Sequence, residues 1–412
     1  MKKLMTMLIG LLALGACGND LDNPEPKRKA RVDIPLTVAE KEMALNGNDF
    51  AFNLFREISR TAGKPGNVIL SPVSISYAFS MLGNGAAGDT EKEIRKVLGF
   101  ERYTWAEVNE YSRKMLEATT ELDPQVSLQI ANSIWLREGL PVLTPFKDVN
   151  KSYYAAEVST LDFSSPQALS LINGWASKHT NGRIPSVLDR IDPEAVFFLL
   201  NAISFKGEWE EPFEKKTTRE ELFMNADGST AVVPMMRRSF TGLCYRGSNY
   251  EMLQLPYGNG AFEMCILLPD KGTTTASVIT ALSEGNWKTI GQNREGYHIN
   301  LKLPRFSTAN SITLNDYLKT LGMPSAFSGC ADLSQLSSQP TYVSLAFQKA
   351  RIEVDEEGTK AEAVTVIQGD LTANIGPSHI QPKDFFVDRP FVYMIREIST
   401  GAIFFMGEIN QM

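Results

Sequence analysis

Apolar residues recur at helical spacing in the first half of the chain. Within residues 48–60, Phe50, Leu54 and Ile58 fall on one face of a helix. Residues 66–100 predict a short strand and two helices, one that begins at a Ser-Pro pair and one that begins after an Asp-Thr pair. Residues 169–184 predict a third helix, which ends at an Asn-Gly pair.

Strand-like runs dominate the second half. Residues 195–209 are an unbroken apolar stretch rich in Phe, which predicts a fully buried strand. Residues 388–409 predict a hairpin that turns at Ser399-Thr400-Gly401. Other strand-like runs occupy residues 126–138, 250–269, 297–306 and 342–354. Because helices come first and strands later, without a regular βαβ repeat, we expect an α+β fold. No linker divides residues 41–412, so they are expected to form a single domain.

The N-terminus has the pattern of an exported, lipid-anchored protein. Two lysines precede the apolar run "LMTMLIGLLALGA", which is too short to span a bilayer. The run ends in "LGAC", which resembles the bacterial lipoprotein box. Residues 1–16 are therefore expected to be a signal peptide and Cys17 the lipidated new N-terminus; the alternative is an ordinary signal peptide with a chance cysteine. Residues 17–40 hold little apolar patterning and predict a flexible tether.

The expected location is the bacterial cell envelope, at the outer membrane, on its periplasmic or its extracellular face. Only the lipid anchor would contact the membrane. The formal net charge of −7 argues against nucleic acid as a partner.

Three cysteines follow Cys17, namely Cys244, Cys265 and Cys330. An odd number in an exported protein argues against a complete disulfide framework, although one pair among them stays open. Cys265 lies in the apolar run "FEMCILLP", where a buried free thiol is expected. The chain has no CxxC pair and no His/Cys cluster, which argues against a structural zinc site.

Catalytic motifs are missing from the sequence. There is no HExxH, GxSxG, GxxxxGK[ST] or GxGxxG motif, and the three histidines are far apart. We therefore expect neither an enzyme nor a metal or cofactor site.

Residues 353–386 combine two patterns in one segment. The first half alternates small or apolar residues with polar ones, as a strand does, and the second half is rich in Gly, Pro, Asn and Ser, as a loop is. The start of this segment is one of seven sequence motifs that occur in the same order in the serpin family of serine protease inhibitors. With these motifs the chain resembles that family over roughly residues 45–410. The seven are "NVILSPVSI", "NGWASKHTNGRI", "LLNAISFKGEWEEPFEKKTT", "LQLPY…MCILLP", "LGMPSAFSGCADLS", "IEVDEEGTKAEA" and "DRPFVYMIREISTGAIFFMGEI".

The resemblance implies three β-sheets, about nine helices and an exposed reactive-centre loop. It also implies a monomer that inhibits serine proteases as a suicide substrate. The protease would cleave the loop and form an acyl-enzyme, and insertion of the loop into the central sheet would trap that covalent complex. The alternative is a non-inhibitory binding protein with the serpin fold, whose loop is only a protease substrate.

The residues of the segment permit such an insertion. If it became a strand after a turn at Glu356 and Gly358, one face would present small or β-branched side chains without charge to the core. The inward positions are Thr359, Ala361, Ala363 and Thr365, followed by Ile367. Both charged residues, Lys360 and Glu362, fall on the opposite face. Gly358 would supply backbone freedom at the turn.

The resemblance also suggests the bond that a protease would cleave. Inhibitory serpins have the scissile residue sixteen positions after the hinge glutamate, which corresponds here to Thr372, with Ala373 on the other side. Such a bond would suit elastase-like or subtilisin-like enzymes, and papain-like cysteine proteases are further candidates. Leu371 and Ile375 are alternative cleavage points.

Five further positions match residues that control opening of the central sheet in the family. They are Ser71, Ser74, Asn201, Trp209 and Gln348. Gln348 departs from the family pattern, because a histidine is common at this position.

Overall fold

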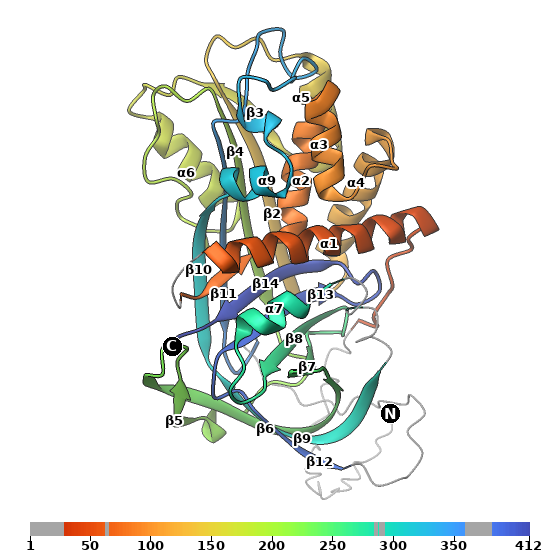
Figure 1. Ribbon diagram of the computed structural model, residues 1–412, viewed down its shortest axis with the longest axis vertical. Coiled ribbons are helices and arrows are strands. Elements are labelled where there is room, and N and C mark those ends of the chain that lie inside the picture. Colours follow the sequence, from red (N-terminus) through yellow and green to blue (C-terminus); the bar gives the residue numbers. More distant parts are fainter. Residues whose placement is uncertain (1–28, 62–65, 284–286, 288–292, 359–380) are drawn as a thin grey trace, which may run out of the picture.

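The computed structural model describes residues 29–61, 66–283, 287, 293–358 and 381–412. The strands of these residues form two hydrogen-bonded sheets. The helices lie mainly around the smaller sheet (Figure 1). The α+β class is confirmed.

The smaller sheet has five strands in the order β10-β11-β4-β2-β3. Their bounds are β10 Phe306–Thr313, β11 Leu345–Val354, β4 Phe197–Gly207, β2 Val126–Arg137 and β3 Glu157–Leu161. The strands β11 and β4 are parallel, whereas β10 runs antiparallel to β11 and β2 runs antiparallel to β4. The sheet therefore has a parallel pair at its centre.

Both faces of β4 are buried, which explains its unbroken apolar sequence. Phe198, Leu200 and Ala202 pack into a cluster with Trp175 of helix α6 (Ala168–His179). Phe197, Leu199 and Ile203 face the main core on the other side of the sheet. Figure 1 shows α6 on one side of β2 and β4, with α2 to α5 on the other. The predicted fully buried strand is confirmed.

The larger sheet has nine strands, in the order β1-β14-β13-β8-β7-β6-β9-β12, with β5 paired to β6. Their bounds are β1 Val68–Leu70, β14 Ile403–Ile409, β13 Phe391–Glu397, β8 Phe262–Pro269, β7 Tyr250–Pro256, β6 Thr230–Arg246, β9 Arg294–Pro304, β12 Pro382–Phe386 and β5 Arg219–Met224. The predicted C-terminal hairpin is the antiparallel pair β13 and β14. The long strand β6 pairs with β5, β9 and β7 and so joins all of them in one sheet. The described strands therefore form two sheets, whereas three were expected.

The remaining helices are α1 Val38–Thr61, α2 Pro72–Gly83, α3 Gly88–Leu98, α4 Trp105–Glu121, α5 Thr144–Tyr154, α7 Thr275–Ala281 and α9 Asn315–Leu321, with short 3-10 turns η1 Lys215–Thr217 and η2 Ser325–Phe327. Local signals explain several ends. Thr104 and Glu107 form a reciprocal capping box at the start of α4. Gly99, at φ 77°, ends α3 in the left-handed conformation.

The folded part begins before residue 41, the predicted start of the domain. Helix α1 starts at Val38, where the Thr37 and Glu40 side chains accept from each other's backbone N–H groups. Ile34 is buried, and its backbone N–H donates to Ser399 Oγ at 3.0 Å. The Ile34–Ser399 bond joins this segment to the turn between β13 and β14.

Two further features of the fold concern the three later cysteines and the lengths of the helices. Cys244, Cys265 and Cys330 are all free, and Cys265 is buried as expected. No helix among the described residues combines the length and apolarity needed to cross a bilayer.

Candidate functional site

The site lies where β11 leaves the centre of the five-stranded sheet. Residues Leu345 to Arg351 of β11 pair in parallel with Phe198 to Ser204 of β4. The side chains at even positions of β11, from Ala346 to Val354, are buried, and Glu356 continues this inward row beyond the strand. The chain then turns at residues 355–358.

A buried amide network ties β11 to β4 and to helix α2. Gln348 Oε1 accepts from the Ser71 backbone N–H at 2.8 Å, and Gln348 Nε2 donates to the Ser71 carbonyl at 3.0 Å. The same Nε2 donates to Asn201 Oδ1 at 2.7 Å. All three residues are at most 1% exposed. In the low-dielectric interior such bonds are strong, and breaking one is costly.

The network continues one strand further than the sequence predicted. Asn201 Nδ2 donates to Asn132 Oδ1 of β2 at 2.8 Å. Asn132 and Asn201 are also directly paired in the β2–β4 register. No sequence signal singles out Asn132, because the strand-like run 126–138 also contains other polar side chains, such as Gln129 and Ser133.

The two predicted serines behave differently from Gln348 and Asn201. Both Ser71 and Ser74 are fully buried, but neither hydroxyl has a hydrogen-bond partner within the described residues. Ser71 contributes to the network through its backbone, while Ser74 takes no part in it. Of the two, only Ser71 therefore links α2 to the sheet.

Trp209 holds the turn that follows β11. Its indole Nε1 donates to the Asp355 carbonyl at 2.9 Å, and its backbone N–H donates to the Glu357 carbonyl at 2.9 Å. The ring is fully buried and stacks on Tyr257 at a centroid distance of 4.5 Å. Trp209 thus fixes the end of β4 against the turn.

Gly358 is the tightest point of this turn. Its φ is 134°, a conformation that side chains disfavour. A Cβ added there would lie 2.2 Å from the Gly207 carbonyl oxygen and 2.6 Å from the Trp209 nitrogen. Both obstacles are backbone atoms, which cannot move aside as a flexible side chain would.

Replacing Gly358 by alanine is therefore expected to destabilise the protein by about 2 kcal/mol or more. The urea unfolding midpoint measures the loss. Gly329→Ala is the matched control, because a Cβ there meets nothing within 4 Å. Equal midpoints for the two variants would contradict the tight packing at Gly358.

Glu356 is the second anchor of the turn. Its carboxylate accepts from Thr218 Oγ1 at 2.7 Å and pairs with Arg305 at 2.6 Å. Burial acts to raise the pKa of Glu356, but the hydrogen bonds from Arg305 and Thr218 outweigh it and hold the pKa below its ordinary value. The neighbouring Glu357 pairs with Lys215.

The lowered pKa of Glu356 predicts a pH dependence of stability. The ionised form is favoured in the folded protein, so its contribution is present above the ordinary pKa of 4.5 and is lost as the pH falls through the lower, folded-state value. Glu356→Gln is expected to flatten the decline of the urea midpoint below pH 4.5. Unchanged steepness in this variant would show that other carboxylates dominate the acid transition.

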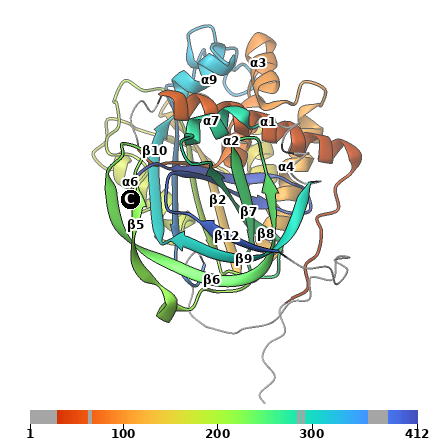
Figure 2. The ribbon, with the colours of Figure 1, turned by 60° about the horizontal axis from the view of Figure 1, so that its bottom comes forward.

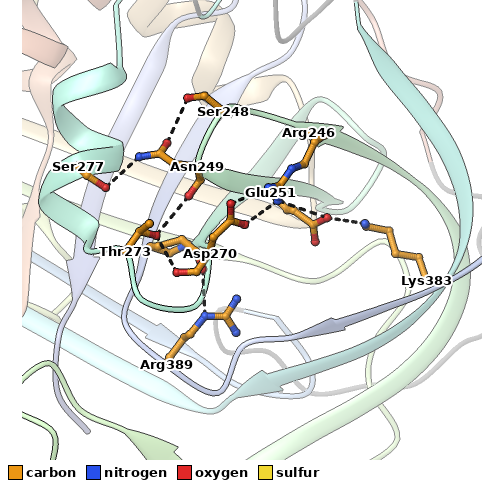
Figure 3. Close-up of polar contacts among 10 residues, drawn as sticks. Arg246, Ser248, Asn249, Glu251, Asp270, Thr273, Ser277, Lys383 and Arg389 are labelled. Atoms are coloured by element: carbon orange, nitrogen blue, oxygen red, sulfur yellow. Dashed lines mark hydrogen bonds and ion pairs between the residues drawn. The ribbon is translucent and has the colours of Figure 1, made fainter.

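A polar cluster fixes β12, the first strand after residue 380. Lys383 Nζ pairs with Glu251 at 2.6 Å (Figure 3). The same amine lies 5.1 Å from the centre of the Tyr297 ring. Arg246 also lies 3.8 Å from Glu251 and pairs with Asp270 at 2.6 Å. The two ends of the undescribed segment 359–380 are therefore both held firmly.

The other predicted site residues lie outside the described part of the chain. They are Thr359, Ala361, Ala363, Thr365, Thr372, Ala373 and the lipidation residue Cys17. Within the described part, no group of three or more His, Cys, Asp and Glu side chains is placed to hold a metal ion.

Comparisons with known proteins agree with this geometry. The family model for serpins (serine protease inhibitors) matches residues 45–412. Iripin-8 of Ixodes ricinus is 35% identical over 382 residues, which cover 90% of this chain and 93% of that protein. Human neuroserpin is 31% identical over 374 residues, covering 88% and 90% respectively.

Solved structures are similar over the same length. The native state of the thermophilic serpin tengpin superposes with a TM-score of 0.81 at 30% identity, covering 94% of this chain and 98% of tengpin. Human thyroxine-binding globulin gives a TM-score of 0.82 at 28% identity, covering 91% and 99%. The chain therefore belongs to the serpin family, whose members are generally protease inhibitors.

Proposed function

We propose that the protein inhibits serine proteases as a suicide substrate. The single observation that carries the proposal is the parallel pair β11 and β4, joined by the Gln348–Asn201 hydrogen bond, with a turn at its end. A protease would cleave the loop that follows the turn, and the freed segment would enter between these two strands while the acyl-enzyme is intact.

The topology of the sheet favours this insertion. A segment that reverses direction after β11 runs antiparallel to β11, and, because β4 is parallel to β11, it runs antiparallel to β4 as well. Insertion would thus replace one parallel ladder by two antiparallel ladders, which are slightly more stable per residue. The amide network is the barrier that would have to open first.

The bait is proposed to be the Thr372–Ala373 bond, and the targets enzymes with small apolar specificity pockets. No Arg or Lys lies between Lys360 and Lys383, which disfavours trypsin-like enzymes. Leu371 and Ile375 stay as alternative cleavage points.

Incubation with pancreatic elastase, subtilisin, chymotrypsin and papain tests the proposal, with trypsin as the matched negative control. A denaturing gel should show a covalent complex with elastase or subtilisin, and the mass of the released C-terminal peptide should identify a cut after Thr372. Cleavage without a complex, and without a rise in melting temperature afterwards, would instead support a binding protein whose loop is only a substrate.

We propose further that Cys17 carries the lipid that anchors the protein to the outer membrane of a bacterial cell. The "LGAC" sequence supports this proposal. Cys17→Ser is expected to move the protein from the membrane fraction to the soluble fraction, since the anchor supplies the membrane affinity. Retention of the variant in the membrane fraction would argue against lipidation. For the anchored wild-type protein, protease accessibility on whole cells would show which face of the outer membrane it occupies.

A further inference from the structure

A small cavity lies on the five-stranded sheet beside the end of α6, with a volume of about 250 Å³. One wall is the segment 182–185, which follows α6, and the other is formed by β4 and β11. Figure 2 shows α6 on the side of β2 opposite α4, as Figure 1 does, so the cavity lies on the face of the sheet away from α4. Neither the sequence motifs nor the inhibitory mechanism accounts for this cavity.

The alternation of side chains along β4 and β11 puts four polar residues on this face. The same face carries the apolar cluster against α6, to which β4 contributes even positions and β11 odd positions, namely Phe198, Leu200, Ala202, Leu345 and Phe347. Ser204 and Lys206 continue the even row of β4, and both line the cavity. Arg351 and Glu353 continue the odd row of β11 and line it as well. Arg351 lies directly beside Ser204 in the parallel pair.

The segment after α6 places a third cation, Arg183, at the cavity. Its neighbours Thr180 and Ile184 are buried, and Thr180 Oγ1 accepts from the Ile184 backbone N–H at 3.0 Å. Gly182, at φ 76°, donates its backbone N–H to the Ser177 carbonyl at 2.8 Å. The backbone is therefore fixed on both sides of Arg183, whose side chain is half-buried in the cavity wall.

Positive charge exceeds negative charge in this cavity. Among the described residues that line it, the cations are Arg183, Lys206 and Arg351, and the carboxylate is Glu353. Glu353 pairs with Arg351 at 2.5 Å. Burial lowers the pKa of Arg183, and the charge of Glu353 acts against this. A single carboxylate cannot balance three cations, and positive charge that is half removed from water favours an anionic ligand.

The next carboxylates on this face do not line the cavity. Glu208, just beyond β4, accepts from Gln125 Nε2 at 3.0 Å. Asp355, just beyond β11, accepts from the Glu357 backbone N–H at 3.0 Å. Both carboxylates therefore have donors of their own, and the excess positive charge is left for a ligand.

The size of the cavity favours a small ion. Its volume is below the range of about 300–1,000 Å³ that is usual for sites of organic ligands. A phosphate dianion carries two negative charges and presents several acceptor oxygens. Guanidinium and ammonium groups donate charge-assisted hydrogen bonds to such oxygens.

We propose that this cavity binds a phosphate dianion, free or as a small monoester, between Arg183, Lys206 and Arg351. Because Lys206 belongs to β4 and Arg351 to β11, the bound anion connects the two strands. Loop insertion requires these strands to part, so the anion would oppose it. This consequence rests on the proposed function, whereas the binding itself does not.

Isothermal titration calorimetry on the intact protein tests the binding at about pH 8, where a phosphate group is mainly a dianion. Inorganic phosphate should bind saturably, and nitrate, a monoanion, should bind about tenfold or more weakly at the same ionic strength. Glycerol 3-phosphate distinguishes the two sources, because tighter binding than that of inorganic phosphate would identify a monoester and weaker binding free phosphate. No saturable binding of either phosphate, or equal affinity for nitrate, would overturn the proposal.

Variants of the lining residues locate the site. Lys206→Met and Arg351→Met should each weaken phosphate binding about tenfold or more, because each removes charged hydrogen bonds. Glu353→Gln removes the competing carboxylate and should strengthen binding, which a folding defect would not do. Arg102→Met, at an exposed arginine that pairs with Glu42, is the control and should leave the affinity unchanged. Full affinity in both cation variants, or weaker binding by Glu353→Gln, would refute the assignment.

The consequence for trapping is measured separately with the target protease. At a phosphate concentration ten times the Kd, about one molecule in ten is free of the anion, so insertion should slow about tenfold. The stoichiometry of inhibition should then rise in the wild type but not in Arg351→Met. An unchanged stoichiometry in the wild type would refute the link to insertion and leave the site to calorimetry. Failure to form any complex, with or without phosphate, would refute the proposed function instead.

Discussion

If the protein traps proteases as proposed, Thr359→Arg is expected to turn it from an inhibitor into a substrate of the protease. Thr359 is the first residue of the proposed inward face, so its replacement would carry a charge into the core as the loop inserts. Burying an unpaired charge costs several kcal/mol. Even about 1.4 kcal/mol added to the insertion barrier slows that step tenfold, while hydrolysis of the acyl-enzyme continues at its own rate.

The stoichiometry of inhibition and the yield of gel-stable complex measure this change. Most molecules of Thr359→Arg should be cleaved in the loop without forming a complex. The rate of the first cleavage should stay the same as in the wild type. Glu362→Arg is the matched control, because position 362 falls on the opposite face of the proposed strand. Undiminished trapping by Thr359→Arg, or equal loss in both variants, would refute the proposed register.

Gln348→Leu is expected to cause the largest loss in the free energy of unfolding. Without the amide, the Ser71 backbone N–H and Asn201 Oδ1 lose their bonds to Gln348, although the Ser71 carbonyl still accepts from Ile75. Leaving a buried polar group unpaired costs about 1–3 kcal/mol, so the two together predict a loss of about 2–6 kcal/mol in the free energy of unfolding.

Urea unfolding of the intact and the loop-cleaved protein measures this effect. Lys349→Leu, the next residue along β11 and on its other face, is the control and should change the midpoint little. If the network is a latch between β11 and β4, Gln348→Leu should destabilise the intact form more than the cleaved form, in which these strands have parted. Equal losses in both forms would make Gln348 a general core residue.

Local sequence patterns were sufficient where an element is strongly periodic or fully apolar. The runs at 195–209 and 388–409 correspond to β4 and to the hairpin of β13 and β14. Helix α4 has no counterpart among the predicted helices, although its capping box, Thr104 and Glu107, is visible in the sequence. Strand β6 had no clear signal, because its burial changes along its length as it passes from β5 to β9 and β7.

The start of the domain could not be read from composition. Val32, Ile34 and Leu36 are apolar, yet Val32 is exposed, while Ile34 is buried and contacts the turn at Ser399, which is far away in the sequence. Three apolar residues at alternate positions do not show which of them packs against the domain, so only tertiary contacts reveal that this segment belongs to the fold.

The sequence by itself determined the α+β class and the family. It also determined that every second residue after Gly358 is uncharged, because these properties depend on residue type and spacing along the chain. The tertiary structure alone decided which polar groups meet. Ser71, Asn132, Asn201 and Gln348 come together only because α2, β2, β4 and β11 pack in one particular register. The physical reason is that hydrogen-bond partners and burial depend on contacts between distant segments, which local spacing does not encode.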